Sequence, residues 1–338
     1  MERNLPLTLL VALLLVGPCR GESFKLAIPP RLQWNANGGY CGEVSLISAG
    51  LYYGQYVSQY TARQAAIGKV PQSQGEMLLG VNDRRAATAL HLNSIEWKTS
   101  AEKSTDGFLR WVKRNVLRGY PVAIGVFTNE NLFYGDTQPD AGDPQYDHIV
   151  PVVRVRSHHP FSSQRFFAND RLTFSDNGLW GNSHQRPYFF SYPFAGFQLD
   201  RAQANAPTGP IYSLPNGGRN YGIAITGVMD RDGDTLPVRV ATNKNYEAPA
   251  MVDGSNARPK PMPLTLRITV SGLEPGTPYR LYRYSDLKAV PDSGFNAHAS
   301  AASATWEIRI SSGTTFTTTQ QILSDEVAVY RAVRASAP

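Results

Sequence analysis

The chain changes character within residues 33–50, QWNANGGYCGEVSLISAG, where a glycine-rich loop gives way to an apolar run. The apolar residues after this loop recur at intervals of three and four, as on one face of a helix; they are Val44, Ile47 and Leu51. We therefore predict a helix that begins at or just after Cys41 and continues to about Tyr60. A cysteine at the first turn of a helix lies at the positive end of the helix dipole, which stabilises the reactive thiolate.

The first 21 residues have the layout of a signal peptide. Arg3 gives a basic start, residues 5–16 are almost wholly apolar, and small residues with Pro18 follow. This apolar part, and every other apolar stretch, is shorter than the roughly 20 residues that span a bilayer. A lipoprotein signal acylated at Cys19 fits poorly, because Pro18 precedes that cysteine. We therefore expect a secreted protein that loses residues 1–21 and has no membrane span.

The composition limits the class of partner. The formal charge is +6, but the basic residues are scattered along the chain, so we expect no nucleic acid as the main partner. Contact with an acidic surface such as a cell wall, made through the C-terminal part, stays open. Loss of Cys19 leaves Cys41 as the single cysteine, so no disulfide can form within the mature chain. No group of Cys and His has the spacing of a zinc site, and we expect neither a metal nor another cofactor.

The N-terminal part, residues 22–205, is predicted to be an α+β domain, because a helix precedes a series of strands. The further elements expected there are a helix from Thr105 or Asp106 to Gly119 and strands at 121–127, 148–155 and 171–175. Residues 198–218 are rich in Ala, Asn, Pro and Gly, and are the expected linker.

The C-terminal part, residues 215–338, alternates apolar and polar side chains, as strands with one buried face do. The clearest runs are 264–270 and 306–310. The segment SGLEPGTPYRLYRY, residues 271–284, resembles the strand-turn-strand of fibronectin type III domains. We predict an all-β sandwich that docks the protein or presents its substrate, and that carries none of the catalytic residues.

Acyl transfer by a thiolate needs three further groups: a histidine as general acid and base, a side chain that orients it, and a donor for the oxyanion. Among the histidines, His148 is the one that begins an apolar strand behind a polar loop, where its ring can face a cleft. It is therefore the predicted partner of Cys41.

The order of motifs over residues 28–185 resembles the papain-like cysteine peptidases, most closely the branch of the bacteriocin-leader-processing, double-glycine peptidases. The shared features are a Gln before a Gly-rich turn, Cys-Gly opening a helix, Gly-x-Pro-Val before a strand, a strand that starts with His, and a strand that ends in Asp or Asn. The resemblance implies a papain-like fold and four roles. Cys41 attacks the scissile carbonyl, His148 shuttles the proton, Asp176 orients the ring and Gln33 completes the oxyanion hole.

Two of these assignments have an alternative. The family places its Gln about where Asn35 stands here, so Asn35 is the alternative oxyanion donor, although the longer side chain of Gln33 reaches farther across the turn. Asn177 is the alternative orienting residue, because its neighbourhood resembles the Asn-Ser-Trp-Gly motif of papain. Asp176 is favoured because it shares a strand face with Phe174. Its spacing from His148 requires residues 158–169 to form a hairpin.

The resemblance implies a secreted cysteine hydrolase, a thiol protease, that cleaves a peptide or related amide bond through a thioester intermediate. Its substrate would be a peptide or protein. Two other functions stay open: a catalytically silent secreted binding or adhesion protein on the same scaffold, and an acyl transferase that uses the same Cys41 and His148. Residues 230–234, DRDGD, resemble a calcium loop, but the glycine is in the wrong place and we predict a turn.

Overall fold

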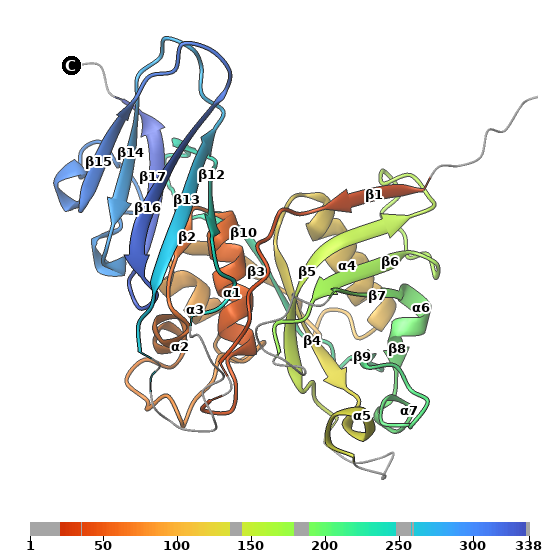
Figure 1. Ribbon diagram of the computed structural model, residues 1–338. Coiled ribbons are helices and arrows are strands. Elements are labelled where there is room, and N and C mark those ends of the chain that lie inside the picture. Colours follow the sequence, from red (N-terminus) through yellow and green to blue (C-terminus); the bar gives the residue numbers. More distant parts are fainter. Residues whose placement is uncertain are drawn as a thin grey trace, which may run out of the picture.

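The computed structural model describes residues 21–34, 36–135, 144–178, 189–247, 258 and 260–335. Residues 1–20 of the predicted signal peptide and Asn35 lie outside the described residues. The chain folds into mixed α and β structure with several antiparallel sheets. Two lobes stand side by side in Figure 1, one with the first three helices and the C-terminal strands, the other with most of the largest sheet.

The largest sheet has the main strand order β3-β10-β4-β5-β6-β7, and these neighbours are antiparallel. Its strands are β3 (Leu92–Glu96), β10 (Gly222–Val228), β4 (Val122–Thr128), β5 (His148–Ser157), β6 (Arg171–Ser175) and β7 (Phe189–Pro193). Three more strands join it at the sides: β1 (Glu22–Lys25) pairs with β5, β9 (Tyr212–Pro215) with β4, and β8 (Gln198–Leu199) with β9. The prediction of strand 171–175 is confirmed, and residues 158–169 connect the antiparallel pair β5 and β6.

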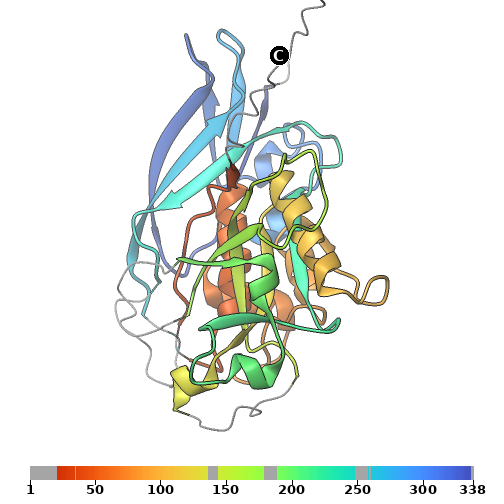
Figure 2. The same ribbon diagram turned by 90° about the vertical axis from the view of Figure 1, so that its right-hand side faces the viewer.

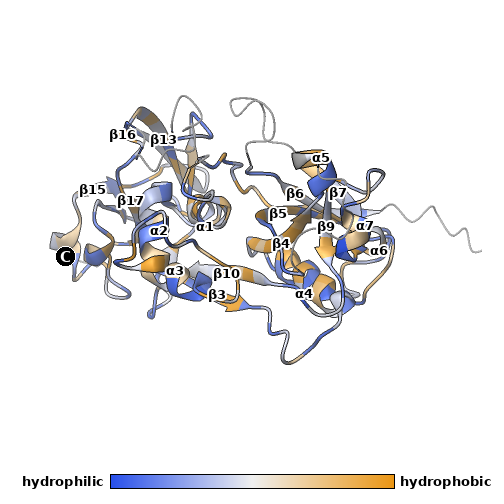
Figure 3. Ribbon diagram, turned by 90° about the horizontal axis from the view of Figure 1, so that it is seen from below, coloured by the Kyte–Doolittle hydropathy of each residue, from blue (hydrophilic) through white to orange (hydrophobic). Residues whose placement is uncertain are grey.

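Helix α4 (Thr105–Leu117) begins where the sequence predicted, because the Ser104 side chain accepts a hydrogen bond from the backbone N–H of Gly107. Its buried residues, among them Phe108 and Val112, pack with the apolar side chains of β4 and β5. Figure 2 brings the lobe that holds this sheet to the front, and Figure 3 shows the apolar colour along β4 and β5. Three short helices lie near the same sheet: α5 (Glu130–Tyr134), α6 (Phe194–Phe197) and α7 (Arg201–Ala204).

Helix α1 (Cys41–Tyr52) begins at Cys41, and all its residues from Gly42 to Leu51 are buried. The prediction that this helix continues to about Tyr60 is wrong. Gly54 has φ 77°, a left-handed conformation that ends the helix at low cost only for glycine. The strand β2 (Gln55–Tyr56) follows, and Ser58 caps the next helix, α2 (Gln59–Ile67). Helix α3 (Asp83–Ala89) completes this lobe.

The C-terminal strands form two antiparallel sheets. The first has the order β11 (Thr235–Leu236), β17 (Ala328–Arg334), β14 (Tyr279–Tyr284) and β15 (Ala304–Ile308), and the second has β12 (Val238–Thr242), β13 (Pro263–Ser271) and β16 (Thr315–Leu323). The apolar residues of β13 are buried and pack in one cluster with Leu281 of β14 and Ala332 of β17. In the described part after β12, the helical turns are the 3-10 segments η1 (Leu287–Ala289) and η2 (Ala299–Ala301).

The two parts of the chain share one hydrophobic core. Residues Leu46 and Ile47 of α1 belong to the same buried cluster as Leu266 of β13. The strand β2 of the first part pairs with β17 of the last. Residues 198–218, the expected linker, include three elements, β8, α7 and β9, and the predicted boundary at 205–215 therefore lies within the largest sheet.

Candidate active site

Cys41 lies at the start of α1, directly after a turn of left-handed residues. Asn37, Gly38 and Gly39 have φ values of 51°, 78° and 94°. This turn brings the backbone N–H of Tyr40 to Gln33, whose Oε1 accepts its hydrogen bond at 2.7 Å. The side chain of Cys41 is partly buried at the edge of the core.

Gly42 allows the close packing that positions the cysteine. A Cβ atom at this residue would lie 2.4 Å from the carbonyl oxygen of Met77 and 3.1 Å from Cδ1 of Ile149 in β5. Real Cβ atoms do not approach so closely, so only glycine lets the first turn of α1 pack against the beginning of β5. His148 is the first residue of that strand.

His148 is buried and held between two polar partners. Its Nε2 lies 3.1 Å from Oδ1 of Asp176, and the side chain of Cys41 lies near enough to help raise its pKa. Because Nε2 faces Asp176, Nδ1 is the nitrogen left for the sulfur. The ring of Tyr212 is stacked with the imidazole, with 6.1 Å between centroids and 20° between planes.

The electrostatics of the site favour a charged histidine. Burial lowers the pKa of His148, but the hydrogen bonds to Asp176 and Cys41 oppose it and raise the pKa to about 10. Burial raises the pKa of Asp176, but His148, the Gly178 N–H at 2.8 Å and Tyr212 outweigh it, so the pKa lies below its usual value. An ionised Asp176 therefore faces a protonated His148 near neutral pH.

Asn177 has a different place from Asp176. Its side-chain amide donates to the carbonyl oxygen of Cys41 at 2.9 Å, to Oγ of Ser45 at 3.0 Å and to the carbonyl oxygen of Ile149 at 3.1 Å. These contacts tie the first turn of α1 to β5. Asp176 is thus the residue that contacts the His148 ring, and Asn177 holds the two elements that carry Cys41 and His148 together.

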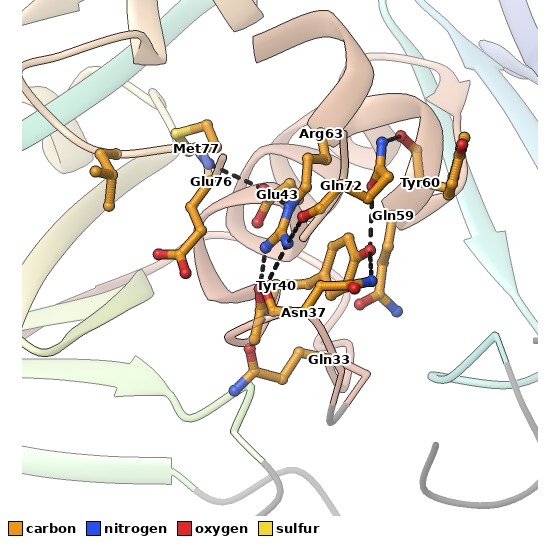
Figure 4. Close-up of polar contacts among 12 residues, drawn as sticks. Gln33, Asn37, Tyr40, Glu43, Gln59, Tyr60, Arg63, Gln72, Glu76 and Met77 are labelled. Carbon is orange, nitrogen blue, oxygen red and sulfur yellow. Dashed lines mark hydrogen bonds and ion pairs between the residues drawn. The ribbon is translucent and has the colours of Figure 1, made fainter. Parts of the chain in front are cut away.

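Gln33 is anchored on both sides. Its backbone N–H donates to the carbonyl oxygen of Asn177 at 2.8 Å, and the next residue, Trp34, donates its N–H to Oε1 of Gln59 at 2.8 Å. Oε1 of Gln33 accepts the hydrogen bond from the Tyr40 N–H. The amide nitrogen of Gln33 therefore points the other way, away from the contacts of Arg63 and Glu43 (Figure 4). The alternative donor, Asn35, lies outside the described residues.

A buried ion pair supports the glycine turn from behind (Figure 4). Arg63 Nε contacts Glu43 Oε1 at 2.6 Å, and both side chains are almost fully buried. Arg63 also donates to the carbonyl oxygens of Asn37, at 2.8 Å, and Gly39, while Glu43 accepts from the N–H of Met77 at 2.9 Å. Burial raises the pKa of Glu43, and the adjacent guanidinium opposes this increase. The pair therefore joins the turn before Cys41 to α1, α2 and the Met77 loop.

Two tyrosines near the site were not predicted. Tyr212 contacts His148 and Asp176 but lies in the segment expected as a linker. The short apolar run of Ile211, Tyr212 and Leu214 between two prolines was the signal for a buried strand. Tyr146 donates its hydroxyl to the carbonyl oxygen of Leu79 at 3.2 Å and lies near enough to Cys41 for their charges to interact; burial raises its pKa.

Comparisons give no family for this site. No protein-family model, no curated protein and no solved structure matches the chain. Across the described ranges, no three His, Cys, Asp or Glu side chains gather where they could hold a metal ion. Nor does any described helix combine the length and apolar character needed to cross a membrane. The chemistry must therefore be inferred from the geometry alone.

Proposed function

We propose that this protein is a cysteine hydrolase with a papain-like arrangement that cleaves peptide or related amide bonds. One observation carries the proposal: the imidazole of His148 lies 3.1 Å from Asp176 and near enough to the side chain of Cys41, which begins α1, for the two to interact. A helix that carries the cysteine in one lobe and a strand that begins with the histidine in the other also support it (Figure 1).

In the first half of the reaction, the Cys41 sulfur attacks the carbonyl carbon of the substrate, and the carbonyl π electrons move to the oxygen. The orphan N–H of Cys41 at the helix start and the amide nitrogen of Gln33 stabilise this oxyanion. His148 gives its Nδ1 proton to the leaving nitrogen, the C–N bond breaks, and a thioester and a free amine remain.

In the second half, His148 is neutral and accepts a proton from a water molecule that attacks the thioester. The C–S bond breaks, the carboxylic acid leaves, and the sulfur returns as a thiolate beside the protonated imidazole. Asp176 keeps its charge throughout. It stabilises the imidazolium and fixes the ring so that Nδ1 faces the sulfur.

Action outside the cell is part of this proposal and rests on the sequence of residues 1–21 alone. The peptide or protein substrate follows from the amide chemistry, and the C-terminal sheets are proposed to dock the protein or present its substrate.

The test is hydrolysis of a randomised peptide mixture in water labelled with heavy oxygen, followed by mass spectrometry. Wild-type protein should give cleavage products whose new carboxyl groups carry the label, and Cys41→Ala should give none. Products joined to an added amine without the label would show an acyl transferase. No products from the folded wild type would favour the silent binding protein.

A further inference from the structure

A cavity of about 370 Å³ lies at the end of α1 remote from Cys41. Tyr53, the residue that ends the helix, lines it together with residues of β10, β11, β12 and β17. Since α1 has 12 residues, this end is about 18 Å from the cysteine. The cavity is thus separate from the candidate active site.

One wall of the cavity holds a buried arginine that forms no direct ion pair. Arg331 of β17 is 1% exposed. Its guanidinium donates to the carbonyl oxygens of Tyr53, at 3.4 Å, and Tyr330, at 2.9 Å, and to Oε1 of Gln55 at 3.2 Å, all of them uncharged acceptors. Its Nε has no hydrogen-bond partner, and no carboxylate of the described residues forms an ion pair with it.

The contacts of Arg331 cap the last turn of α1, but they do not balance its charge. A neutral donor would satisfy the same carbonyl oxygens. Burial lowers the pKa of Arg331 to about 10, although the charges of Tyr284, Asp230 and Asp292 oppose this, so the guanidinium is still charged near neutral pH. A buried charge is expensive unless an opposite charge accompanies it.

A second arginine lines the same cavity. The guanidinium of Arg239 in β12 lies 3.6 Å from the ring centroid of Tyr52, and its hydrogen bond goes to the carbonyl oxygen of Val238 at 3.3 Å. Arg239, too, forms no ion pair with a carboxylate of the described residues. Neither cationic group therefore has a carboxylate of the described residues at ion-pair distance, although Asp230 and Asp292 act on Arg331 from farther away.

The carboxylate in the lining, Asp230, is near enough to Arg331 for their charges to interact, but its hydrogen bonds go to a turn. Asp230 accepts from the N–H of Gly233 at 3.1 Å and from the N–H and hydroxyl of Thr235 at 2.7 and 2.8 Å, within the turn predicted for residues 230–234. The rest of the lining is mainly apolar or aromatic, including Leu236, Val238 and Tyr330.

We propose that this cavity binds a small organic carboxylate. The carboxylate group lies against Arg239 and Arg331, and an apolar body packs between Tyr53, Leu236 and Tyr330. The cavity volume is at the lower end of the range for small-molecule sites, which fits a ligand of about ten heavy atoms. Such a ligand would bridge α1 and the two C-terminal sheets.

The experiment is calorimetric titration of the full chain with phenylacetate and hexanoate, with phenylacetamide as the uncharged isostere. Either carboxylate should bind saturably at one site, and the amide should bind at least about tenfold more weakly, because charge-assisted hydrogen bonds are lost. Arg239→Gln, a half-buried position, should weaken carboxylate binding by a similar factor. Arg280→Gln, at a half-buried position of β14 outside the cavity lining, is the matched control and should leave binding unchanged.

Three results would overturn the proposal: no saturable binding of either carboxylate to folded protein, equal binding of phenylacetamide, or unchanged binding in Arg239→Gln. Arg331→Met can be used as a further variant when its circular dichroism matches that of the wild type. The comparison of phenylacetate with phenylacetamide uses the wild type alone and does not depend on the folding of any variant.

Discussion

Replacing Glu43 by Gln removes the carboxylate that faces Arg63 behind the glycine turn. The side chains of Arg63 and Glu43 are 0% and 1% exposed, and 2.6 Å separates Nε from Oε1. Gln can still accept the hydrogen bond from the Met77 N–H, so the main loss is the negative charge. Arg63 then remains buried without a counter-ion, next to the ring of Tyr40 at 3.7 Å.

The expected destabilisation is about 3–5 kcal/mol, the cost of removing one partner of a buried ion pair. The matched control is Glu274→Gln, which removes the partner of Arg334 at 3.1 Å. Those two side chains are 68% and 66% exposed. Solvent screens such a pair, and its loss should change the free energy of unfolding by less than about 1 kcal/mol.

The measurement is urea unfolding followed by tryptophan fluorescence, compared among wild type, Glu43→Gln and Glu274→Gln. Trp34 is 7% exposed and packs with Tyr40, so one of the five tryptophans that give the signal lies in the loop itself. If Glu43→Gln and Glu274→Gln lower the free energy of unfolding equally, the buried pair does not hold this turn and the reasoning fails.

Three further outcomes are expected. The Cε1 proton of His148 should titrate in NMR spectra near pH 10, the value to which its pKa is raised. The Cys41→Ala variant should have a lower midpoint, because a group that raises the pKa of His148 is lost. A wild-type midpoint near 6.5 would contradict the site. Burial raises the pKa of Asp83 from 3.8 to about 7, and the neighbouring Glu96 adds to it. The folded state therefore binds a proton that the unfolded state releases, and the free energy of unfolding should fall as pH rises from about 4 to 7. Asp83→Asn should flatten this dependence on pH. An unchanged dependence in the variant would refute the assignment. A fragment that ends near residue 205 should not unfold cooperatively, because it lacks strands of the shared core, and a cooperative transition would show an independent first domain.

The elements that sequence predicted best are those with local determinants. The apolar residues of α4 recur at helical spacing, so its start at Thr105 or Asp106 could be predicted, although Ser104 rather than either of these residues caps it. The strand at residues 171–175 could be predicted from its own composition. By contrast, β9 is fixed by pairing with β4, far away in the chain, and a linker composition hid it. Strand β10 lies in the part expected as a separate sandwich, but it pairs with β3 and β4 of the largest sheet.

The residues of the candidate site also divide into those with local sequence determinants and those that depend on contacts far apart in the chain. The chemical types of Cys41 and His148 and their places at the start of a helix and a strand could be predicted from the sequence. The Glu43–Arg63 pair could not, because its partners lie 20 residues apart and contact only through the packing of α1 on α2. Tyr212 was not predicted for a similar reason, since its contact with Asp176 depends on β9 joining the largest sheet.

The most direct measurement of the central claim is the rate at which iodoacetamide alkylates Cys41 at about pH 6. A free thiol with a pKa of about 8.5 is almost wholly protonated there and reacts slowly. Mass spectrometry of peptides separates Cys41 from Cys19, and wild-type protein unfolded in urea supplies the free-thiol rate. If His148 holds the sulfur as a thiolate, folded wild type should react at least about tenfold faster than both the unfolded chain and folded His148→Ala. Equal rates in folded wild type and folded His148→Ala would contradict the proposed nucleophile.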